Sequence, residues 1–172
     1  NLLSVTRIED GKMNLHLETE LIEEVINEAL NHISHKKDEH RIEVKANDEF
    51  ILAKIDAGLI IQVIINIVDN AIKYTPKGSM ISIETFKHKD FVEIQIADDG
   101  AGISDKDKEK LFEMFYTVKH EVIDGRRGLG LGLALCKAII VAHGGNIAVK
   151  DNIPHGTIFS FTLPIKEVEI HE

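Results

Sequence analysis

The sequence predicts an α+β domain, a two-layer α/β sandwich in which helices cover one face of a mixed sheet. Two observations lead to this fold class. Strand-like segments with alternating apolar residues come mostly in adjacent pairs, most clearly 80–88 with 91–99 and 146–151 with 157–164. Segments with helical spacing lie between these strands, and a helix with one apolar face must pack against a second layer to bury that face.

The elements of the first half follow from the spacing of apolar residues and from turn residues. The opening segment, 1–11, has the spacing of the last turns of a helix that ends at Gly11. The further elements predicted in this half are a strand at 13–20, a helix at 21–30, a polar loop at 31–40, a pair of short strands at 41–47 and 49–55, and a helix at 56–74.

The second half continues the alternation of strands and helices. Its predicted elements are a hairpin over 80–99, a short helix from Ser104 or Asp105, a mobile segment at 117–127, a helix over 131–143, and two strands at 146–151 and 157–164. Gly144 and Gly145 end the helix over 131–143, as glycines commonly do.

Composition is that of an ordinary globular domain and excludes several classes. The 172 residues are 44% apolar and 28% charged, which is enough for one core. The net charge of −9 argues against a general nucleic-acid surface, which would show a basic excess. The single cysteine, Cys136, excludes an intramolecular disulfide and fits a reducing compartment. Gln62 and Asn66 interrupt the richest apolar run, 59–68, which is too short to span a bilayer.

Three glycines alternate with leucines at the entrance of the helix predicted at 131–143. Gly128, Gly130 and Gly132 leave the backbone uncovered, and a helix N-terminus offers N–H groups and a positive dipole end that suit a polyphosphate. The run is not a Walker loop, and Leu133 stands where a dinucleotide fingerprint needs its third glycine. On this motif alone, a flexible hinge before a core helix remains an equal alternative.

The strand 91–99 is predicted to end with an inward-pointing acid. Apolar residues from Val92 to Ile96 alternate onto one face, so the two-residue period puts Asp98 on that face and Asp99 on the other. A carboxylate at an apolar face is costly unless it accepts hydrogen bonds. Asp98 could accept them from the exocyclic amine of adenine, which would select ATP over GTP, or it could cap the following Gly-Ala-Gly turn.

A stripe of polar residues runs along the apolar helix 56–74. Gln62, Asn66, Asn70 and Lys73 fall at helical spacing on one side. Amide oxygens suit Mg²⁺, which prefers hard oxygen donors, and a lysine can reach phosphate as a point charge. The alternative is that these amides bond neighbouring backbone groups.

Together, and in this order, the three stretches resemble the catalytic, ATP-binding domain of sensor histidine kinases, within the group that includes Hsp90, gyrase B and the mismatch-repair protein MutL. The boxes of that family resemble residues 66–76 (N box), 98–103 (first glycine box), 111–116 (F box) and 128–145 (second glycine box). Residues 1–11 are similar to the end of the second dimerisation helix. With the second glycine box, they resemble the potassium-responsive kinases of the Kdp system.

The resemblance implies a role for each matching residue. Asn70 would ligate Mg²⁺ with Asn66 beside it near the metal, Lys73 would contact phosphate, and Asp98 would accept from the adenine amine. The full set implied to bind ATP is Asn66, Asn70, Lys73, Tyr74, Asp98, Gly100, Gly102, Ile103, Lys119, Arg127, Gly128, Leu129, Gly130, Leu131, Gly132, Leu133 and Thr157.

Segment 117–127 would be the ATP lid, in which Lys119, Arg126 or Arg127 could neutralise phosphate charge. Near the end of the chain the sequence departs from the family's Gly-x-Gly-Thr motif. Pro154 stands in place of the first glycine, although Thr157 is retained.

The nine histidines do not supply the phosphoacceptor that the family requires. His120 is followed by an acid, as in that motif, but the later proline is missing. The histidine-rich segment 32–40 is interpreted as a solvated loop, since no second ligand pair supports a metal site.

The resemblance implies transfer of the γ-phosphoryl group of MgATP to a histidine on dimerisation helices, and then to an aspartate of a response regulator. The acceptor histidine would precede Asn1, so the chain would bind ATP without phosphorylating itself. The expected parts are a helix end and linker at 1–12, the catalytic domain at 13–166 and a tail at 167–172. The parent protein would be dimeric and attached to the cytoplasmic side of a membrane, and this part of it monomeric.

Two other function classes remain open from the residues. An ATP-driven clamp uses an acid just before the N-box asparagine to activate water. Ile65 precedes Asn66, but Asp69 precedes Asn70, so slow hydrolysis that is lost in Asp69→Asn would favour the clamp. An interaction module that binds no nucleotide would show no thermal shift with ADP and Mg²⁺.

Overall fold

The computed structural model describes residues 14–33, 40–45, 50–113 and 129–165. Its elements are β1 (Glu18–Leu21), α2 (Ile22–Asn31), β2 (Arg41–Val44), β3 (Leu52–Ile55), α3 (Ala57–Lys73), β4 (Met80–Lys87), β5 (Phe91–Asp98), α4 (Asp105–Lys110), α5 (Leu129–Ala142), β6 (Ile147–Asp151) and β7 (Thr157–Pro164). The expected linker at 1–12 and the tail at 167–172 lie outside the described residues.

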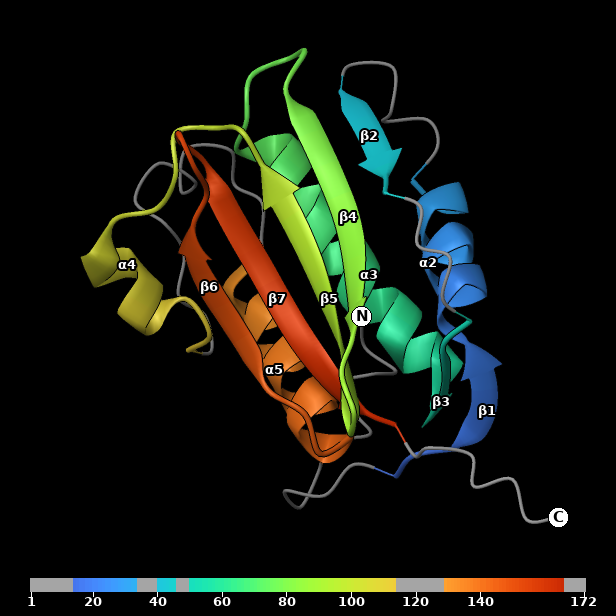
Figure 1. Cartoon of the computed structure of the whole chain (residues 1–172). Helices are drawn as coiled ribbons and strands as arrows, with labels where there is room; N and C mark the ends of the chain where they lie inside the picture. Colours follow the sequence, from blue (N-terminus) through green and yellow to red (C-terminus); the bar gives the residue numbers. More distant parts are fainter. Residues whose placement is uncertain (1–13, 34–39, 46–49, 114–128, 166–172) are drawn as a thin grey trace, which may run out of the picture.

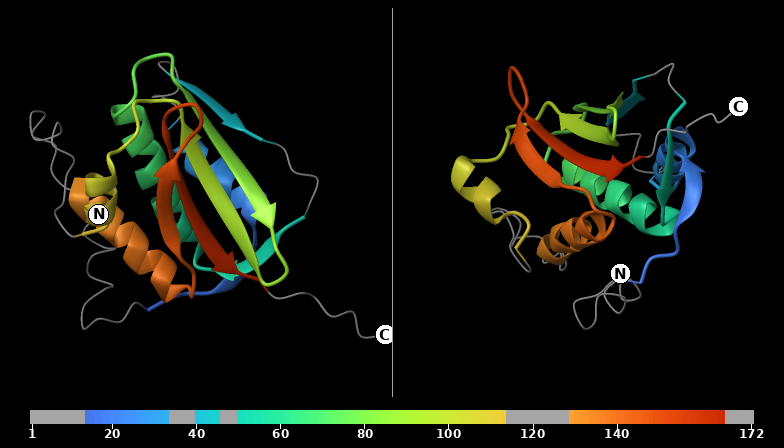
Figure 2. Two further views of the ribbon diagram at one scale, coloured as in Figure 1. Left: turned by 60° about the vertical axis from the view of Figure 1, so that its left-hand side comes forward. Right: turned by 60° about the horizontal axis from the view of Figure 1, so that its bottom comes forward.

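A five-stranded sheet in the order β2-β4-β5-β7-β6 forms one layer of the domain. Its pairs are antiparallel except β2 with β4, which is parallel, so the sheet is mixed. Helices α2, α3 and α5 lie side by side against one face of this sheet (Figures 1 and 2). The predicted fold class is therefore confirmed.

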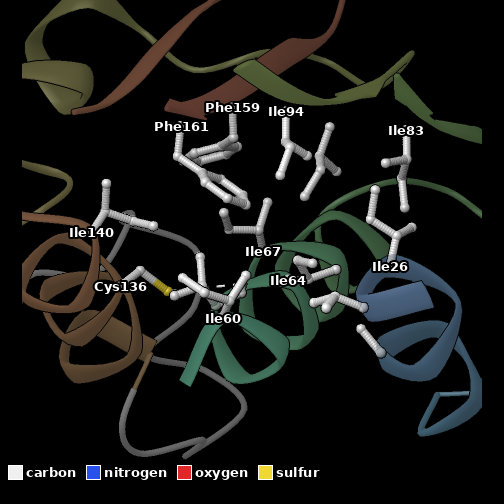
Figure 3. Close-up of a cluster of buried hydrophobic side chains, with 14 of the residues drawn as sticks. Ile26, Ile60, Ile64, Ile67, Ile83, Ile94, Cys136, Ile140, Phe159 and Phe161 are labelled. Atoms are coloured by element: carbon white, nitrogen blue, oxygen red, sulfur yellow. Dashed lines mark hydrogen bonds between the residues drawn. The ribbon is translucent and has the colours of Figure 1, made fainter. Parts of the chain in front are cut away.

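Helix α3 is the central helix of the second layer and lies between α2 and α5 (Figure 2). It begins after Asp56, whose side chain accepts a hydrogen bond from the N–H of Leu59. Such a cap satisfies one of the unpaired N–H groups of the first turn. Ile60, Ile64 and Ile67 are fully buried and face the inward side chains of the sheet (Figure 3).

The register of the hairpin β4–β5 determines to which face of the sheet Asp98 and its neighbours point. The register pairs Ile81 with Asp98 and Ile83 with Ile96, so that all four side chains point to the same face. Ile81, Ile83 and Ile96 are buried against the helices, and Asp98 is 8% exposed. Asp99 is exposed, as the alternation predicts.

Four elements differ from the sequence-based expectations. The strand expected at 13–20 is β1 and begins only at Glu18, because its pairing with β3 starts there; the N–H of His16 instead donates to the Asp56 carboxylate (3.0 Å). The short strands β2 and β3 belong to two different sheets. Helix α5 begins at Leu129, two residues earlier than expected.

The helix expected from Ser104 or Asp105 is α4, and the Ser104 hydroxyl caps it by accepting from the N–H of Asp107. Lys108 forms an ion pair with Asp151 on β6 (2.6 Å), which connects α4 to the edge of the sheet. Within the described parts of the chain, no helix is both long and apolar enough to cross a membrane.

Candidate functional site

Asp98, the last residue of β5, carries the most constrained side chain of the candidate site. Its Oδ1 accepts hydrogen bonds from the N–H groups of Gly100 (2.9 Å) and Thr157 (3.2 Å). Its Oδ2 has no hydrogen-bond partner among the described residues. The cap of the Gly-Ala-Gly turn therefore exists, and it still leaves one carboxylate oxygen for another donor.

The protonation of Asp98 reflects its position. Burial raises the pKa of the carboxyl above its usual range, because a charged group loses hydration there. The N–H groups of Gly100 and Thr157 act in the opposite direction by stabilising the charge, and the neighbouring Asp99 raises the pKa further. An amine donor on Oδ2 would give the ionised form an additional partner.

Two of the glycines around Asp98 leave no room for a side chain. Gly156 has φ +113°, and a Cβ there would lie 2.0 Å from the carbonyl oxygen of Asp98. A Cβ on Gly100 would lie 2.6 Å from Cγ2 of Thr75. The backbone segments after β5 and before β7 therefore pack in direct contact, which only glycine permits.

The loop before β7 supplies residues that the sequence analysis did not identify. Asn152 Nδ2 donates to the carbonyl oxygen of Asp98 (2.8 Å), and His155 Nδ1 lies 3.1 Å from the carbonyl oxygen of Gly100. An asparagine shortly before a proline and a glycine is a recognisable turn signal. That signal predicts a turn but not the strand end to which the turn binds.

Thr75, directly after α3, holds the other side of Gly100. Its hydroxyl donates to the carbonyl oxygen of Ala71 (2.6 Å), so its oxygen accepts from Nε2 of the buried His40 (2.8 Å). This assigns the proton of His40 to Nε2. The Nδ1 atom is buried and has no hydrogen-bond partner in the described structure.

The polar stripe of α3 divides into partnered and unpartnered amides. Asn66 Oδ1 accepts from Gln62 (3.0 Å), and Asn66 Nδ2 donates to the Cys136 thiol of α5 (3.7 Å). Burial raises the pKa of that thiol to about 12, so it stays protonated. Asn66 thus bridges two helices.

Asn70 is the amide that remains available on this stripe. It is 8% exposed, and its carboxamide has no hydrogen-bond partner among the described residues. The carboxamide atoms of Asn70 are not among the buried side-chain atoms that lack a partner, so they are reachable from solvent, and an amide oxygen is the donor type that Mg²⁺ prefers. Asn70 therefore fits a metal ligand better than Asn66 does. The described residues hold no group of three or more His, Cys, Asp or Glu side chains that could bind a metal by themselves.

Other residues predicted to bind ATP lie on the same elements as Asn70 and Asp98 or next to them. Lys73 is half-buried in the last turn of α3, and Tyr74, the C-cap, is 41% exposed. Gly102 has φ +83° and lies against the backbone of Gly156, and Ile103 packs at the edge of the core. Thr157 is buried and reaches Asp98 through its backbone N–H.

The second glycine box forms the first turns of α5. Leu129, Gly130 and Leu131 lie in the helix, and a Cβ on Gly132 would lie 3.8 Å from Nδ2 of Asn66. Leu133 is buried in the core. The residues predicted to neutralise phosphate or approach it from the lid lie outside the described residues, and they are Lys119, Arg126, Arg127 and Gly128.

Residues 55–167 match the family described as histidine kinase-, DNA gyrase B-, and HSP90-like ATPase. The sensor protein KdpD of Clostridium acetobutylicum is 42% identical over 164 residues, which are 95% of this chain and 18% of that protein. The chain thus spans about a fifth of that relative.

Solved structures show the same architecture. The catalytic domain of the histidine kinase ThkA superposes with a TM-score of 0.75 at 28% identity, over 87% of this chain and 95% of that domain. ThkA in complex with the response regulator protein TrrA superposes with a TM-score of 0.76 at 28% identity, over 95% of this chain and 46% of that one.

Proposed function

The chain belongs to the histidine kinase-, DNA gyrase B- and HSP90-like ATPase family and is a histidine kinase catalytic domain, and from this premise we propose that it binds MgATP between Asp98 and Asn70. The carrying observation is that each residue keeps one polar group without a partner among the described residues: Oδ2 of Asp98 and the carboxamide of Asn70. The two groups lie on two different elements: Asp98 ends β5 and Asn70 lies in α3.

The base end of the site recognises adenine through Asp98. An ionised carboxylate accepts a hydrogen bond from the exocyclic amine of adenine, whereas guanine presents a carbonyl oxygen at that position and repels it. Because Oδ1 is occupied by two N–H donors, Oδ2 is the oxygen that meets the base. Charge-assisted hydrogen bonds of this kind are about twice as strong as neutral ones.

The phosphate end uses α3 and the start of α5. Asn70 supplies an amide oxygen to Mg²⁺, Asn66 holds α3 against α5 beside it, and Lys73 contacts phosphate. When bound, Mg²⁺ neutralises the charge that develops on the phosphates. The N-terminus of α5 adds backbone N–H groups and a favourable dipole.

The complete reaction extends beyond this chain. We propose that the γ-phosphoryl group of ATP moves to a ring nitrogen of a histidine outside residues 1–172, which leaves ADP, and then to an aspartate of a response regulator. The ThkA–TrrA complex supports a response regulator as a partner, and the KdpD relative supports a kinase of the Kdp type within a dimeric, membrane-attached parent.

The direct test is nucleotide binding by the chain itself. We expect ADP with Mg²⁺ to raise the unfolding temperature, with an added stability of about 2.7 kcal/mol when ADP is at a hundred times its dissociation constant. GDP with Mg²⁺ should give a much smaller shift. An unchanged unfolding temperature with all nucleotides would contradict the proposal. In the parent kinase, ATP should produce acid-labile phosphohistidine.

A further inference from the structure

The loop between β6 and β7, residues 152–156, packs against Asp98, the proposed base contact, and against Gly100. Two of its hydrogen bonds, together with the one from Thr157, define how it meets the end of β5. Asn152 Nδ2 donates to the Asp98 carbonyl (2.8 Å), and His155 Nδ1 lies 3.1 Å from the Gly100 carbonyl. The N–H of Asn152 also donates to the Gly156 carbonyl (3.0 Å), which closes the loop on itself.

Asn152 is fixed at both ends of its side chain. While Nδ2 binds the Asp98 carbonyl, Oδ1 accepts from the N–H of Ile153 (2.9 Å). An asparagine held at both its donor and its acceptor has one orientation, and a nearby shift of the loop must break one of the two bonds. The Asn152 side chain therefore fixes the distance between the loop and the end of β5.

The loop in turn determines which oxygen of Asp98 is used inside the molecule. Thr157 follows the loop, and its N–H is one of the two donors that hold Oδ1 (3.2 Å). If the loop moves away from β5, this donor leaves, and the carboxylate can rotate about its terminal torsion, which is a broad one. The direction in which Oδ2 points thus depends on the hydrogen bond that Asn152 makes to the backbone carbonyl of Asp98.

We propose that Asn152 is a positioning residue for base selectivity: by tying the β6–β7 loop to the carbonyl of Asp98, it fixes the carboxylate in the orientation that accepts from adenine. The inference rests on the proposed function, because it concerns the same base contact. His155 supports the same arrangement through Gly100, whose N–H is the second donor to Oδ1.

The test compares three substitutions in the loop by titration calorimetry with ADP and with GDP, each in Mg²⁺. Asn152→Asp keeps the size and the acceptor of the side chain and replaces the donor that faces the Asp98 carbonyl. Asn152→Ala removes both bonds. Ile153→Ala is the matched control, since that side chain is 90% exposed.

We expect both Asn152 variants to lose about fivefold to tenfold in ADP affinity, the size expected for one partly buried hydrogen bond. GDP affinity should stay the same or rise, so the ratio of the two affinities falls, while Ile153→Ala keeps the parent's ratio. A residue that only stabilised the loop would lower both affinities together.

Two results would overturn the inference. One is parental ADP and GDP affinities in Asn152→Ala, and the other is an equal loss of both nucleotides in Asn152→Asp. A wild-type chain that binds neither nucleotide would instead contradict the proposed function itself. If Asn152→Ala fails to fold, Asn152→Asp and its thermal unfolding curve carry the comparison.

Discussion

The two ends of the candidate site are built in opposite ways. At the base end, the turn after β5 and the β6–β7 connection meet at Asp98, and hydrogen bonds from Gly100, Thr157 and Asn152 fix both its carboxylate and its carbonyl. At the metal end, Asn70 lies on the regular helix α3, and its carboxamide has no hydrogen-bond partner among the described residues. The protein fixes Oδ1 and the carbonyl of Asp98 and leaves Oδ2 without a partner, whereas the whole carboxamide of Asn70 has none among the described residues.

This difference has an energetic meaning. A fixed carboxylate costs little further ordering when a base binds, so under the proposed function selectivity would be built in before binding. The carboxamide of Asn70 makes no hydrogen bond to the described residues, so a metal there would replace solvent and would break no protein hydrogen bond. We therefore expect substitutions at the base end to change selectivity, and substitutions at the metal end to change the response to Mg²⁺.

The largest effect is expected from Gly156→Ala, which tests whether the base end depends on close backbone contact. The Cβ would lie 2.0 Å from the Asp98 carbonyl, at φ +113°. We expect a loss of about 3–5 kcal/mol in the free energy of unfolding, measured in urea, together with the loss of ADP binding. Gly78→Ala is the control: φ is +87° with no atom within 4 Å, so only about 1–2 kcal/mol is lost. Equal losses would refute the contact.

Asp98→Asn separates the charge from the shape of the base contact. The amide oxygen can still accept from Gly100 and Thr157, but the Nδ2 amide group replaces Oδ2 and places a donor opposite the adenine amine. ADP affinity should fall about tenfold to a hundredfold, with or without Mg²⁺. Since burial raises the pKa of Asp98, the unliganded variant should be as stable as the parent at pH 7, or more so. Parental ADP binding by calorimetry would show that Asp98 does not contact the base.

The raised pKa of Asp98 also predicts two opposite dependences on pH. Between the ordinary and the raised pKa, the folded state binds more protons than the unfolded state, so the contribution of Asp98 to stability decreases as pH rises through that window. ADP affinity requires the carboxylate and therefore falls as pH is lowered through the raised pKa. Calorimetry in a series of buffers should show this loss in the parent and not in Asp98→Asn. Identical profiles would contradict it.

Asn70→Ala tests the metal end. ADP affinity in Mg²⁺ should fall about tenfold, and chelation of Mg²⁺ should make the variant and the parent bind alike. Asn66→Ala is the matched variant, because its amide is already bound to Gln62 and Cys136. This substitution should lower the free energy of unfolding by about 1 kcal/mol, and its ADP affinity should depend on Mg²⁺ more as the parent's does. A metal dependence that disappears only in Asn66→Ala would reverse the two assignments.

The smallest effect is expected from Asp99→Asn. Its side chain points away from the core and accepts from the N–H of Met80 (3.0 Å), which an asparagine oxygen can replace. Stability should change by less than about 0.5 kcal/mol. ADP affinity, measured beside that of Asp98→Asn, should stay within about twofold of the parent. A loss as large as that of Asp98→Asn would mean that the strand register places the wrong acid at the site.

Local periodicity was sufficient to predict which side chains share one face of a single strand or helix. The two-residue period of β5 placed Asp98 inward, and the helical spacing of α3 placed Asn66 and Asn70 on one stripe. The strand pairs β4–β5 and β6–β7 followed from short connections. These predictions depend only on neighbours in sequence.

The remainder depended on contacts between distant residues. Asn66 and Asn70 are the same residue type on the same stripe, and only Cys136 on α5 distinguishes the bridging amide from the available one. Asn152 and His155 lie in a loop without periodicity, so their attachment to the end of β5 was not predictable. The parallel pairing of β2 with β4 likewise joins strands separated by a whole helix.

Under the proposed base contact, the position of Asp98 on a strand paired on both sides would limit how nucleotide selectivity can change during evolution. β5 lies between β4 and β7, so a slip by one residue would exchange the two adjacent acids and break both ladders at once. Insertions in the turn at 88–90 must therefore be absorbed within the turn itself. A new nucleotide preference would then arise by point substitutions at Asp98 or in the β6–β7 loop. It would not arise by a change in the length of the β4–β5 hairpin.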